Sequence, residues 1–571
     1  MKKIFLLVCI AASLTIEAAT QITVAQFISN ADTETAYRLR GWLSMEYITS
    51  GGNNSQKYGS YYFADETGEI LMYNPTNWKS FSLAVGDTLT IEGVYATYGS
   101  TKEVKNPTII EVVHPSTDEP DIPEPDCTGI DYNQTYVDFE TAFACGWDNW
   151  IGKTLTFMNG FYLCDRDNNI VAPSRLRAPE EYGEEGTKAY EYAVTRNANM
   201  QCRLTGLSFD SGCRLGAMIQ SGLQAKVVAA NQLQALNTPP VNYWLFLSPP
   251  QRKGGDTLLV CAANLQNFFV TLGGYAGAEN ETQLERQKTK ISKALYAIDA
   301  DIYALCELEQ GPNAATELVS LLNALAGKEQ YDWIDEGFTY YDGLMICYIY
   351  RTDKVQPYGN YIMPYTSAAM KYREAIQCFE QNSTGERFNL ALNHFYAKTS
   401  KEDSYRVENM NSLINKFYSA TQNDEDILVV GDLNAYTMEE SNLKLTRDKG
   451  YTDLLMKYAP QEYSYVYNGL VGYLDHAYCN PSMENQVLSA EPCHFNADAY
   501  YRMGYKYDTS MSFERYADHD PILITLQLGK KSPTEAIEVQ TDKVPATKII
   551  ESGRVVIIRG GVRYTITGQR L

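Results

Sequence analysis

The feature that most constrains the fold of this chain is an uninterrupted apolar run that stops at a glycine and leads into an acid and an amide. Residues 427–430 are Ile-Leu-Val-Val, Gly431 follows, and Asp432 and Asn434 stand on the next turn. A short run of this kind predicts a strand covered on both faces, as in the interior of an α/β domain. Side chains at the end of such a strand are fixed by the sheet and often serve function, although Gly-Asp-x-Asn also makes an ordinary Asx turn.

The region around this run alternates between strand and helix patterns. Apolar residues recur at helical spacing in 281–298, which predicts a helix with one buried face. Alternating strands and helices predict an α/β sandwich. We expect strands at 257–263, 301–306, 344–350, 388–394 and 522–526, and helices at 281–298, 315–326 (with Leu318, Leu321, Leu322 and Leu325 inward) and 405–418.

Polar residues stand at or just after the ends of these predicted strands. A lone histidine is more often a satisfied core residue, and paired acids often bracket a turn. However, the chain has only five histidines and three of them fall in these clusters, so that chance is a poor explanation. The clusters are Asn264, Glu307, Asn393 with His394, Asp432 with Asn434, Asp475 with His476, and Asp518 with His519 and Asp520.

Taken in this order, the clusters resemble the motifs of the endonuclease/exonuclease/phosphatase superfamily, which includes the pancreatic-type deoxyribonucleases. Segments 286–288, 299–301, 393–398 and 463–469 are similar to its secreted bacterial nuclease branch. The resemblance spans residues 255–528. It implies a four-layer α/β/β/α sandwich as the catalytic domain and a metal-dependent phosphodiester hydrolase as the activity.

The resemblance also implies a metal site. Glu307 would be the principal ligand of a hard divalent cation, with Asn264 beside it and Asp518 completing the set. Hydrolysis of a phosphodiester builds negative charge in the transition state, and a cation held by oxygen ligands stabilises that charge. Mg²⁺ is the expected ion and Mn²⁺ the alternative. Asp432 would orient and deprotonate the attacking water.

The other catalytic assignments follow from the same resemblance. Asn434 would donate to a phosphoryl oxygen. His519 would contact the phosphate, with Asp475 setting its tautomer and favouring its charged form. His394 would bind the phosphate or protonate the leaving oxygen.

Two substrate-binding residues and one structural histidine complete the expectation. Arg373 and Asn393 are expected to bind substrate, with Arg373 neutralising a neighbouring phosphate. Related sequences favour Arg-x-Pro at this point, whereas this chain has Ala375. His476 is expected to be structural.

Two β-rich modules and a tail flank the catalytic region. Residues 1–19 are typical of a signal peptide, because a basic start precedes an apolar run of about 11 residues, too short to span a bilayer. Residues 20–113 resemble an OB-like barrel, which would bind oligonucleotide or sugar or act as a spacer. A Pro-rich acidic linker at 114–126 leads to a second β-rich module at 127–250. Residues 530–571 read as a linker and a β-hairpin, either a sorting tail for export across an outer membrane or a docked hairpin.

Cysteines and acids allow two further expectations. The chain has 12 cysteines, of which Cys9 lies in the predicted signal peptide, so that an odd number remains. The acidic stretch 180–185 is a candidate Ca²⁺ site, with an exposed solvated loop as the alternative. We expect Cys261, Cys306 and Cys347 to be buried thiols, and the better disulfide candidates to be Cys127, Cys145, Cys164, Cys202 and Cys213.

The net charge excludes few classes of substrate. A formal charge of −22 and a pI near 4.8 argue against non-specific nucleic-acid binding by the surface at large, but not against a local cleft. We expect a monomeric, secreted or cell-surface endonuclease acting on DNA and RNA, with the periplasm as the alternative location. A phospholipid or inositol-phosphate phosphodiesterase and a non-enzymatic binding protein are the competing functions. The expected partners are nucleic acid as substrate and outer-membrane export machinery, with no integral membrane segment after signal cleavage.

Overall fold

The computed structural model divides after Gly529 into two compact units. The predicted signal peptide up to residue 18 and the predicted linker at 114–126 lie outside the described residues. No helix in the described part of the chain is long and apolar enough to cross a bilayer. The structure describes residues 19–49, 52–65, 67–85, 87–99, 101–113, 129–209, 213–242, 254–274, 276–334, 343–363, 373–529, 546–551, 554–559 and 562–564.

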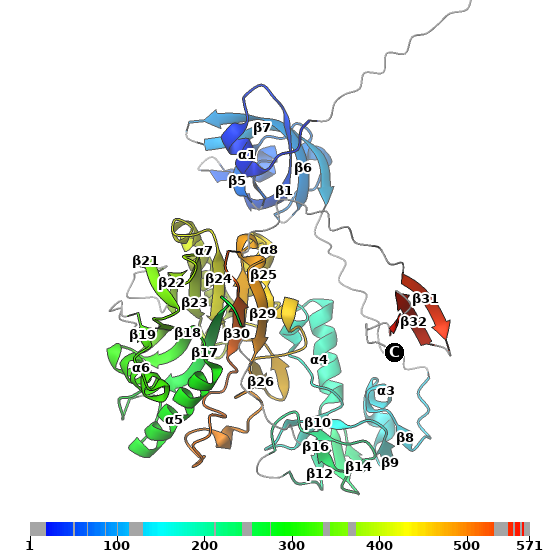
Figure 1. The fold of residues 1–571 in the computed structure, drawn as a ribbon. Helices are drawn as coiled ribbons and strands as arrows, with labels where there is room; N and C mark the ends of the chain where they lie inside the picture. The colour runs from blue at the N-terminus through cyan, green and yellow to red at the C-terminus, as the bar shows by residue number, and fades with distance from the viewer. Residues whose placement is uncertain are drawn as a thin grey trace, which may run out of the picture. The chain divides into compact units, whose positions relative to one another are not determined.

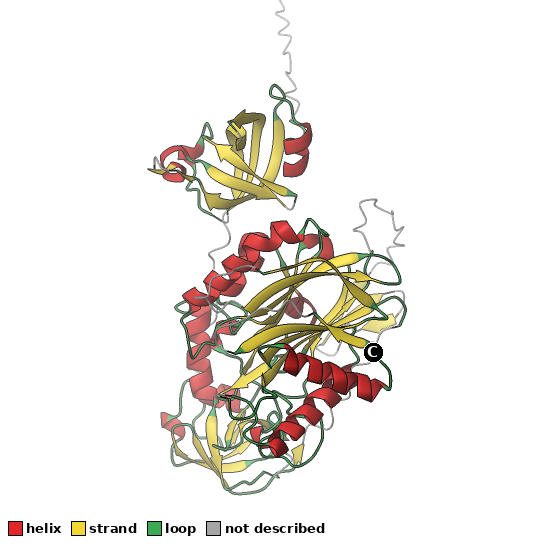
Figure 2. Cartoon of the chain, turned by 90° about the vertical axis from the view of Figure 1, so that its left-hand side faces the viewer, coloured by secondary structure: helices red, strands yellow, loops and turns green. Residues whose placement is uncertain are grey.

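Two six-stranded sheets form the centre of the region that carries the predicted motifs (Figures 1 and 2). The first has the order β19 (Tyr331–Trp333), β20 (Leu344–Arg351), β18 (Ile302–Glu309), β17 (Leu258–Phe268), β30 (Ile522–Leu526), β29 (Val487–Pro492). The second has the order β21 (Val355–Ile362), β22 (Arg373–Gln381), β23 (Arg387–His394), β24 (Ile427–Asp432), β28 (Asp475–Cys479), β25 (Thr452–Asp453).

The two sheets share one pattern of strand directions. Each has a single parallel pair, β17 with β18 in the first sheet and β23 with β24 in the second. Every other neighbouring pair in both sheets is antiparallel. Functional loops collect at the carboxyl ends of parallel strands, so that this pattern offers one such edge in each sheet.

The sheets pack face to face and helices cover their outer faces, which confirms the predicted four-layer α/β/β/α sandwich. One apolar core, containing Val260 and Leu428, fills the space between the sheets. A second core joins the first sheet to helices α5 (Glu281–Ile298) and α6 (Pro312–Ala326), and a third joins the second sheet to α7 (Asp403–Ala420) and α8 (Glu440–Lys449).

The predicted helices are present with small differences at their ends. Helix α5 matches the predicted 281–298, with its four periodic apolar residues buried. Helix α6 ends at a left-handed Gly327, as expected of a glycine stop. The predicted inner stripe of α6 is wrong at Leu325, which is 40% exposed, because Leu322 and Ala326 form the inward face of the last turn instead.

The N-terminal module is a closed five-stranded barrel with the strand order β1-β4-β5-β7-β6. Its core contains Phe63 and Ile91, and the short helix α1 (Val24–Asn30) packs on it through Phe27. The strands are β1 (Tyr37–Glu46), β4 (Tyr61–Asp65), β5 (Gly68–Tyr73), β6 (Thr88–Tyr98) and β7 (Thr101–Val113).

The middle module is β-rich, as predicted, and also contains helix α4 (Lys188–Met200), which the sequence pattern did not indicate. Its single nine-stranded sheet packs on an aromatic core that includes Trp150 and Phe157. The sheet order is β16 (Val241–Asn242), β13 (Met218–Ile219), β10 (Phe161–Asp165), β11 (Ile170–Ala172), β12 (Cys202–Thr205), β15 (Gln232–Ala235), β14 (Gln224–Ala229), β9 (Thr154–Phe157), β8 (Tyr136–Val137).

The cysteines only partly follow the prediction. Cys145 is disulfide-bonded, and Cys261, Cys306 and Cys347 are buried thiols as expected. The expectation of disulfides was wrong for Cys164, Cys202 and Cys213, which are buried and form no disulfide. All three belong to the apolar core of the middle module, where a thiol packs as a small hydrophobic group.

The second unit contains an antiparallel three-stranded sheet. Strands β32 (Arg554–Arg559) and β33 (Val562–Tyr564) pair around residues 560–561, where a hairpin was predicted, and β31 (Ala546–Glu551) adds a third strand.

Candidate active site

One row of residues crosses the second sheet at the carboxyl ends of its central strands. The Cα partners are Arg373 with His394, His394 with Asp432, and Asp432 with Asp475. These four residues come from β22, β23, β24 and β28, and neighbouring side chains at one level of a sheet are close enough to interact. The backbone register alone therefore brings four of the predicted site residues together.

Strand alternation decides which of these side chains face the space between the sheets. In β24, Leu428 and Val430 belong to the core between the sheets, and Asp432 continues the same face. In β17, Val260 and Ala262 belong to that core, and Asn264 continues it from the opposite sheet. The two sheets therefore present a carboxylate and an amide to each other where their shared core ends.

Glu307 reaches the same place only because its strand is irregular. Tyr303 and Leu305 of β18 pack on the helical side, so that regular alternation would send Glu307 there as well. The register of β18 with β20 shifts between Leu305 and Leu308, and Glu307 has a φ of 63°. Such a bulge with a left-handed residue re-aims a side chain.

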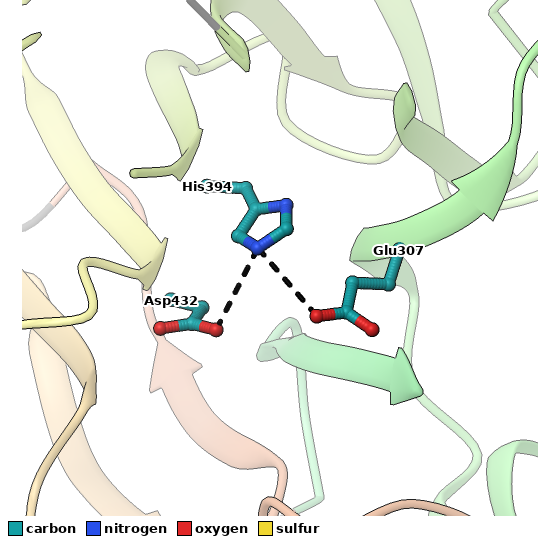
Figure 3. Close-up of side chains that lie close together, drawn as sticks. All are labelled: Glu307, His394 and Asp432. Carbon is teal, nitrogen blue, oxygen red and sulfur yellow. Dashed lines mark ion pairs between the residues drawn. The ribbon is translucent and has the colours of Figure 1, made fainter. Parts of the chain in front are cut away.

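The side chains meet at hydrogen-bonding distance across the two sheets. The Asn264 amide nitrogen donates to Glu307 Oε1 at 3.1 Å and to Asp432 Oδ2 at 3.0 Å. His394 Nε2 lies 3.6 Å from Glu307 Oε1 and 3.9 Å from Asp432 Oδ2 (Figure 3). Residues from four strands thus converge on one small volume.

Arg373 fixes the protonation state of His394. A guanidinium nitrogen of Arg373 lies 3.0 Å from His394 Nδ1. Because a guanidinium only donates hydrogen bonds, Nδ1 must be the accepting nitrogen, and the proton of the neutral ring stands on Nε2. Burial lowers the pKa of His394 well below 6.5, and the charge of Arg373 lowers it further. His394 therefore presents a neutral N–H donor to the two carboxylates.

The charged groups around His519 have the opposite effect to those around His394. Its Nδ1 lies 2.7 Å from Asp475 Oδ2 and 4.0 Å from Asp432 Oδ2. Burial alone would lower the pKa of His519, but the charges of Asp475 and Asp432 outweigh burial and raise it well above 6.5. The ring of Tyr465, in β26 (Tyr465–Tyr467), packs against the imidazole with centroids 4.6 Å apart. His519 is therefore a held imidazolium.

The carboxylates repel one another at a buried position. Burial raises the pKa of Glu307, and the charge of Asp518 adds to the rise. Burial also raises the pKa of Asp432 to about 7; His519 opposes this rise, whereas Asp475 and Glu307 increase it. Oxygen donors crowded in this way suit a hard divalent cation, which favours their charged forms.

A glycine is required beneath this cluster. Gly431 has a φ of 127°, and a Cβ there would stand 2.1 Å from the carbonyl oxygen of Asn393. The turn continues through Asn434, which has a φ of 49° and a backbone N–H that donates to Asp432 Oδ1 at 2.9 Å. The motif that dominates the sequence thus serves to orient the Asp432 carboxylate.

Among the described residues, the side chains of three predicted site residues form no hydrogen bond or ion pair with those of Glu307, His394 or Asp432, although Asp518 is close enough for its charge to act on Glu307. Asn393 is fully buried and its amide nitrogen donates to the carbonyls of Ala391 and Val430, so that the structure does not bring it to the cluster. The Asn434 amide donates to the Phe395 carbonyl at 3.2 Å, beside the cluster. Asp518 is half-buried next to His519.

His476, expected to be structural, packs in the interior. Its Nε2 lies near the Ala435 carbonyl and the Asn442 amide, and its Nδ1 lies 3.0 Å from the Tyr478 hydroxyl. These partners are uncharged, and the ring is 1% exposed.

The middle module supplies a residue that sequence reasoning missed. Glu181, in the acidic stretch predicted as a Ca²⁺ site or an exposed loop, is 9% exposed and ion-paired with Arg177 at 2.8 Å. Its Oε1 accepts from the Tyr473 N–H at 2.9 Å, and its Oε2 accepts from the Thr437 hydroxyl at 3.1 Å. Neither prediction fits this carboxylate, because protein donors surround it.

Glu181 touches both chain segments that flank the site. Thr437 follows the Asp432 turn by a few residues, and Tyr473 precedes Asp475 in the chain. The middle module also pairs with β27 (Leu470–Gly472), where the Ala178 N–H donates to the Val471 carbonyl at 2.9 Å. The middle module therefore supports the walls of the site.

We expect Glu181→Ala to lower kcat about tenfold with little change in KM, because the segments carrying Asp432 and Asp475 lose a shared anchor. A small chromogenic phosphodiester is the right substrate, since it removes any effect of polymer binding. Glu181→Gln, which keeps one acceptor, should recover part of kcat. Glu185→Ala, an exposed acid of the same stretch, is the matched control. An unchanged kcat in Glu181→Ala would contradict the anchoring role.

Comparisons with known proteins found solved structures that are similar to about half of this chain. No family model matches the chain, and no curated protein does. An endonuclease/exonuclease/phosphatase from Bacteroides vulgatus is 16% identical and covers 48% of this chain and 98% of its own, with a TM-score of 0.36. A mannosyl-6-phosphatase from Bacteroides thetaiotaomicron is 17% identical over 47% of this chain and 98% of its own, with a TM-score of 0.36. The human nocturnin catalytic domain with bound sulfate is 16% identical and covers 48% of this chain and 94% of its own, with a TM-score of 0.34.

The matched structures include members of the superfamily that the sequence motifs resemble. Their identities are low, and each match covers about half of this chain.

Proposed function

We propose that this protein is a divalent-metal-dependent phosphodiesterase whose main substrate is nucleic acid. One observation carries the proposal: Asn264 and Glu307 from one sheet meet Asp432 and His394 from the other within 3.9 Å. Oxygen ligands, a buried carboxylate and two histidines in opposite charge states are the groups that metal-assisted phosphoryl chemistry uses.

The residues present fit a hard cation. Glu307 supplies carboxylate oxygens, and Asp518 is close enough for its charge to raise the pKa of Glu307. The Asn264 amide directs its nitrogen to Glu307 and Asp432 and its Oδ1 to the Gln266 N–H, so that it would bind the ion through an oxygen only after its amide turns over. Mg²⁺ prefers one or two protein carboxylates and carbonyl oxygens, with water and substrate phosphate completing its sphere. When bound there, the ion would supply positive charge beside the scissile phosphate.

The protein's own groups have separable tasks in this proposal. Asp432 orients the attacking water and accepts its proton, because it is the buried carboxylate whose pKa rises to about 7. His519, held charged by Asp475, donates to a non-bridging phosphoryl oxygen. His394 donates through its Nε2–H, which favours phosphate binding over the proton donation that the sequence left open.

The predicted signal peptide and the net charge bear on the location and the substrate. We propose that the protein is secreted, which agrees with the predicted signal peptide and with an extracellular nuclease. The net charge of −22 requires that a polyanion be bound locally rather than by the whole surface. A phospholipid phosphodiesterase is the second candidate, since the catalytic groups would serve any phosphodiester.

The decisive experiment incubates purified protein with plasmid DNA, RNA and sphingomyelin, with and without Mg²⁺. We expect DNA and RNA to be cleaved with Mg²⁺ or Mn²⁺, and turnover to fall at least about a hundredfold after treatment with EDTA, because the cation supplies a main part of the transition-state stabilisation. Activity should return when Mg²⁺ is added in excess.

The other outcomes are equally informative. Chelator-resistant cleavage would contradict the metal requirement. Cleavage of sphingomyelin alone would favour the second candidate. Absence of hydrolysis of all three substrates would leave a binding protein and reject the enzymatic proposal.

A further inference from the structure

A cavity of about 280 Å³ lies beside the carboxylate cluster. Three tyrosines and two cations line it, namely Tyr501, Tyr505, Tyr507, Lys506 and Arg515. Ala276 has the only aliphatic side chain among the described lining residues. Ligand sites of drug-sized molecules run from about 300 Å³ upward, so this cavity suits a single ring system.

The wall of the cavity is also the support of the candidate metal site. Gln266 and Asn267 line the cavity and have left-handed backbones, with φ of 50° and 54°. The Gln266 N–H donates to Asn264 Oδ1 at 2.8 Å, and the Asn267 N–H donates to Glu307 Oε2 at 2.8 Å. A group in the cavity therefore lies next to a phosphate held at Glu307.

Two of the tyrosines form an open aromatic corner. Tyr501 is 40% exposed and Tyr507 is 58% exposed, and their ring centroids lie 5.5 Å apart with planes at 87°. Tyr505 is nearly buried between them in the chain, at 5% exposure. Tyr501 also contacts the Tyr500 ring, with centroids 4.8 Å apart, and the Arg502 guanidinium. Tyr507 is therefore the ring that offers the more exposed face to a flat ligand.

Arg515 places a cation at the same cavity. It has a φ of 54°, and its guanidinium donates to the Asn496 carbonyl at 2.7 Å. The Asn496 amide in turn donates to the His519 carbonyl, which ties this wall to the imidazolium. Among the described residues, no carboxylate oxygen lies within 4.0 Å of the Arg515 nitrogens. Burial lowers the pKa of Arg515, and the charges of Asp518 and Asp520 oppose this lowering without an ion-pair contact.

We propose that this cavity binds the nucleobase adjoining the scissile phosphate, with the base stacked on Tyr507, its edge toward Tyr501, and a flanking phosphate on Arg515. Aromatic side chains stack on any base, and a guanidinium pairs with phosphate. The lining lacks the aliphatic surface that an acyl chain needs. This inference rests on the proposed function and narrows its substrate to nucleic acid.

The proposal predicts a preference for unpaired strands. A base in a duplex is stacked and paired, and it must leave the helix before it enters a pocket of this size. Single-stranded DNA or RNA meets no such cost. The wild-type protein should therefore have a lower KM for a single-stranded oligonucleotide than for the same sequence in a duplex.

The test compares Tyr507→Ala with Tyr507→Phe on two single-stranded substrates, one with bases and an abasic oligonucleotide of equal length. Loss of one stacking platform should raise KM about tenfold for the base-bearing substrate. The abasic substrate should show no change, and Tyr507→Phe should behave as the wild type. Tyr418→Ala, at a residue 79% exposed on α7, is the matched control.

Each outcome decides one of the two claims. An unchanged KM in Tyr507→Ala, or an equal rise on the abasic substrate, would overturn the base pocket while leaving the phosphodiesterase intact. If the wild type cleaves neither substrate, the proposed function fails instead. Binding of a fluorescein-labelled oligonucleotide then tests the cavity alone: a tenfold weaker Kd in Tyr507→Ala supports it, and an equal Kd rejects it.

Discussion

Replacing Asp432 by alanine is expected to lower kcat/KM for a phosphodiester by at least about a hundredfold, the scale of losing one positioned catalytic group. The Asp432 side chain is 2% exposed and is held by the Asn264 amide and the Asn434 N–H. The chain therefore fixes one carboxylate at the point where the proposed mechanism places the attacking water.

The same substitution should not unfold the protein. Like charges and burial raise the pKa of Asp432 to about 7, so that its ionised form is held at a cost to stability. The melting temperature of Asp432→Ala should equal or exceed that of the wild type, which is typical of residues kept for function. Asp332→Ala, at an exposed residue of β19, is the control for a lost carboxylate. A folded Asp432→Ala protein with near-normal turnover would discard the mechanism.

The second large effect concerns His494, which sequence reasoning did not single out. Its Nδ1 lies 2.9 Å from Asp520 Oδ2 and its Nε2 lies 2.9 Å from Glu462 Oε2. Burial would lower the pKa of His494, but hydrogen bonds to Asp520 and Glu462 outweigh it and raise the pKa to about 10. Both ring nitrogens donate, so that the folded protein holds an imidazolium between two carboxylates.

We expect His494→Gln to lower the melting temperature, and the loss to depend on pH. The folded pKa lies above the ordinary value of about 6.5, so that the imidazolium stabilises the fold fully below pH 6.5 and progressively less as pH rises through about 10. At about 1.4 kcal/mol per pKa unit, the full contribution is on the order of 5 kcal/mol.

Calorimetric melting at pH 6, 8 and 10 measures this directly. The gap in melting temperature between wild type and His494→Gln should be largest at pH 6 and should narrow toward pH 10. Glu491→Gln, at an exposed residue of β29, is the control. Its melting temperature should differ from that of the wild type by an amount that does not narrow as pH rises. A gap of the same size at all three pH values would mean that His494 contributes packing rather than charge.

Residues with a local signal in the sequence could be placed from the sequence alone. Helical spacing gave the bounds of α5, and alternation placed His394 on the same face as Phe388, Leu390 and Leu392, three residues of the core between the sheets. The α/β sandwich was predicted because strand and helix periods are properties of neighbouring residues, and its four layers were implied by the resemblance of the motifs to a known superfamily. The catalytic and ligand roles of the individual residues remain predictions.

What sequence could not predict depends on contacts between distant segments. The bulge that turns Glu307 toward Asn264 has no local signature, and the pairing of Arg373 with His394 exists only across two strands. The acidic stretch around Glu181 has the composition of a solvated loop, and only the packing of the middle module on β27 buries it. In each case tertiary contact overrode the local pattern.

The pairing of β17 with β30 has a consequence for how the protein is made. These strands adjoin in the first sheet, yet β30 leaves the ribosome about 250 residues after β17. At roughly 5–20 residues per second, that delay is roughly 10 to 50 seconds. Because His519 and Asp518 directly precede β30, a nascent chain carries Asn264 and Glu307 long before the site closes, and whatever chemistry the site performs begins only as translation of the sandwich is completed.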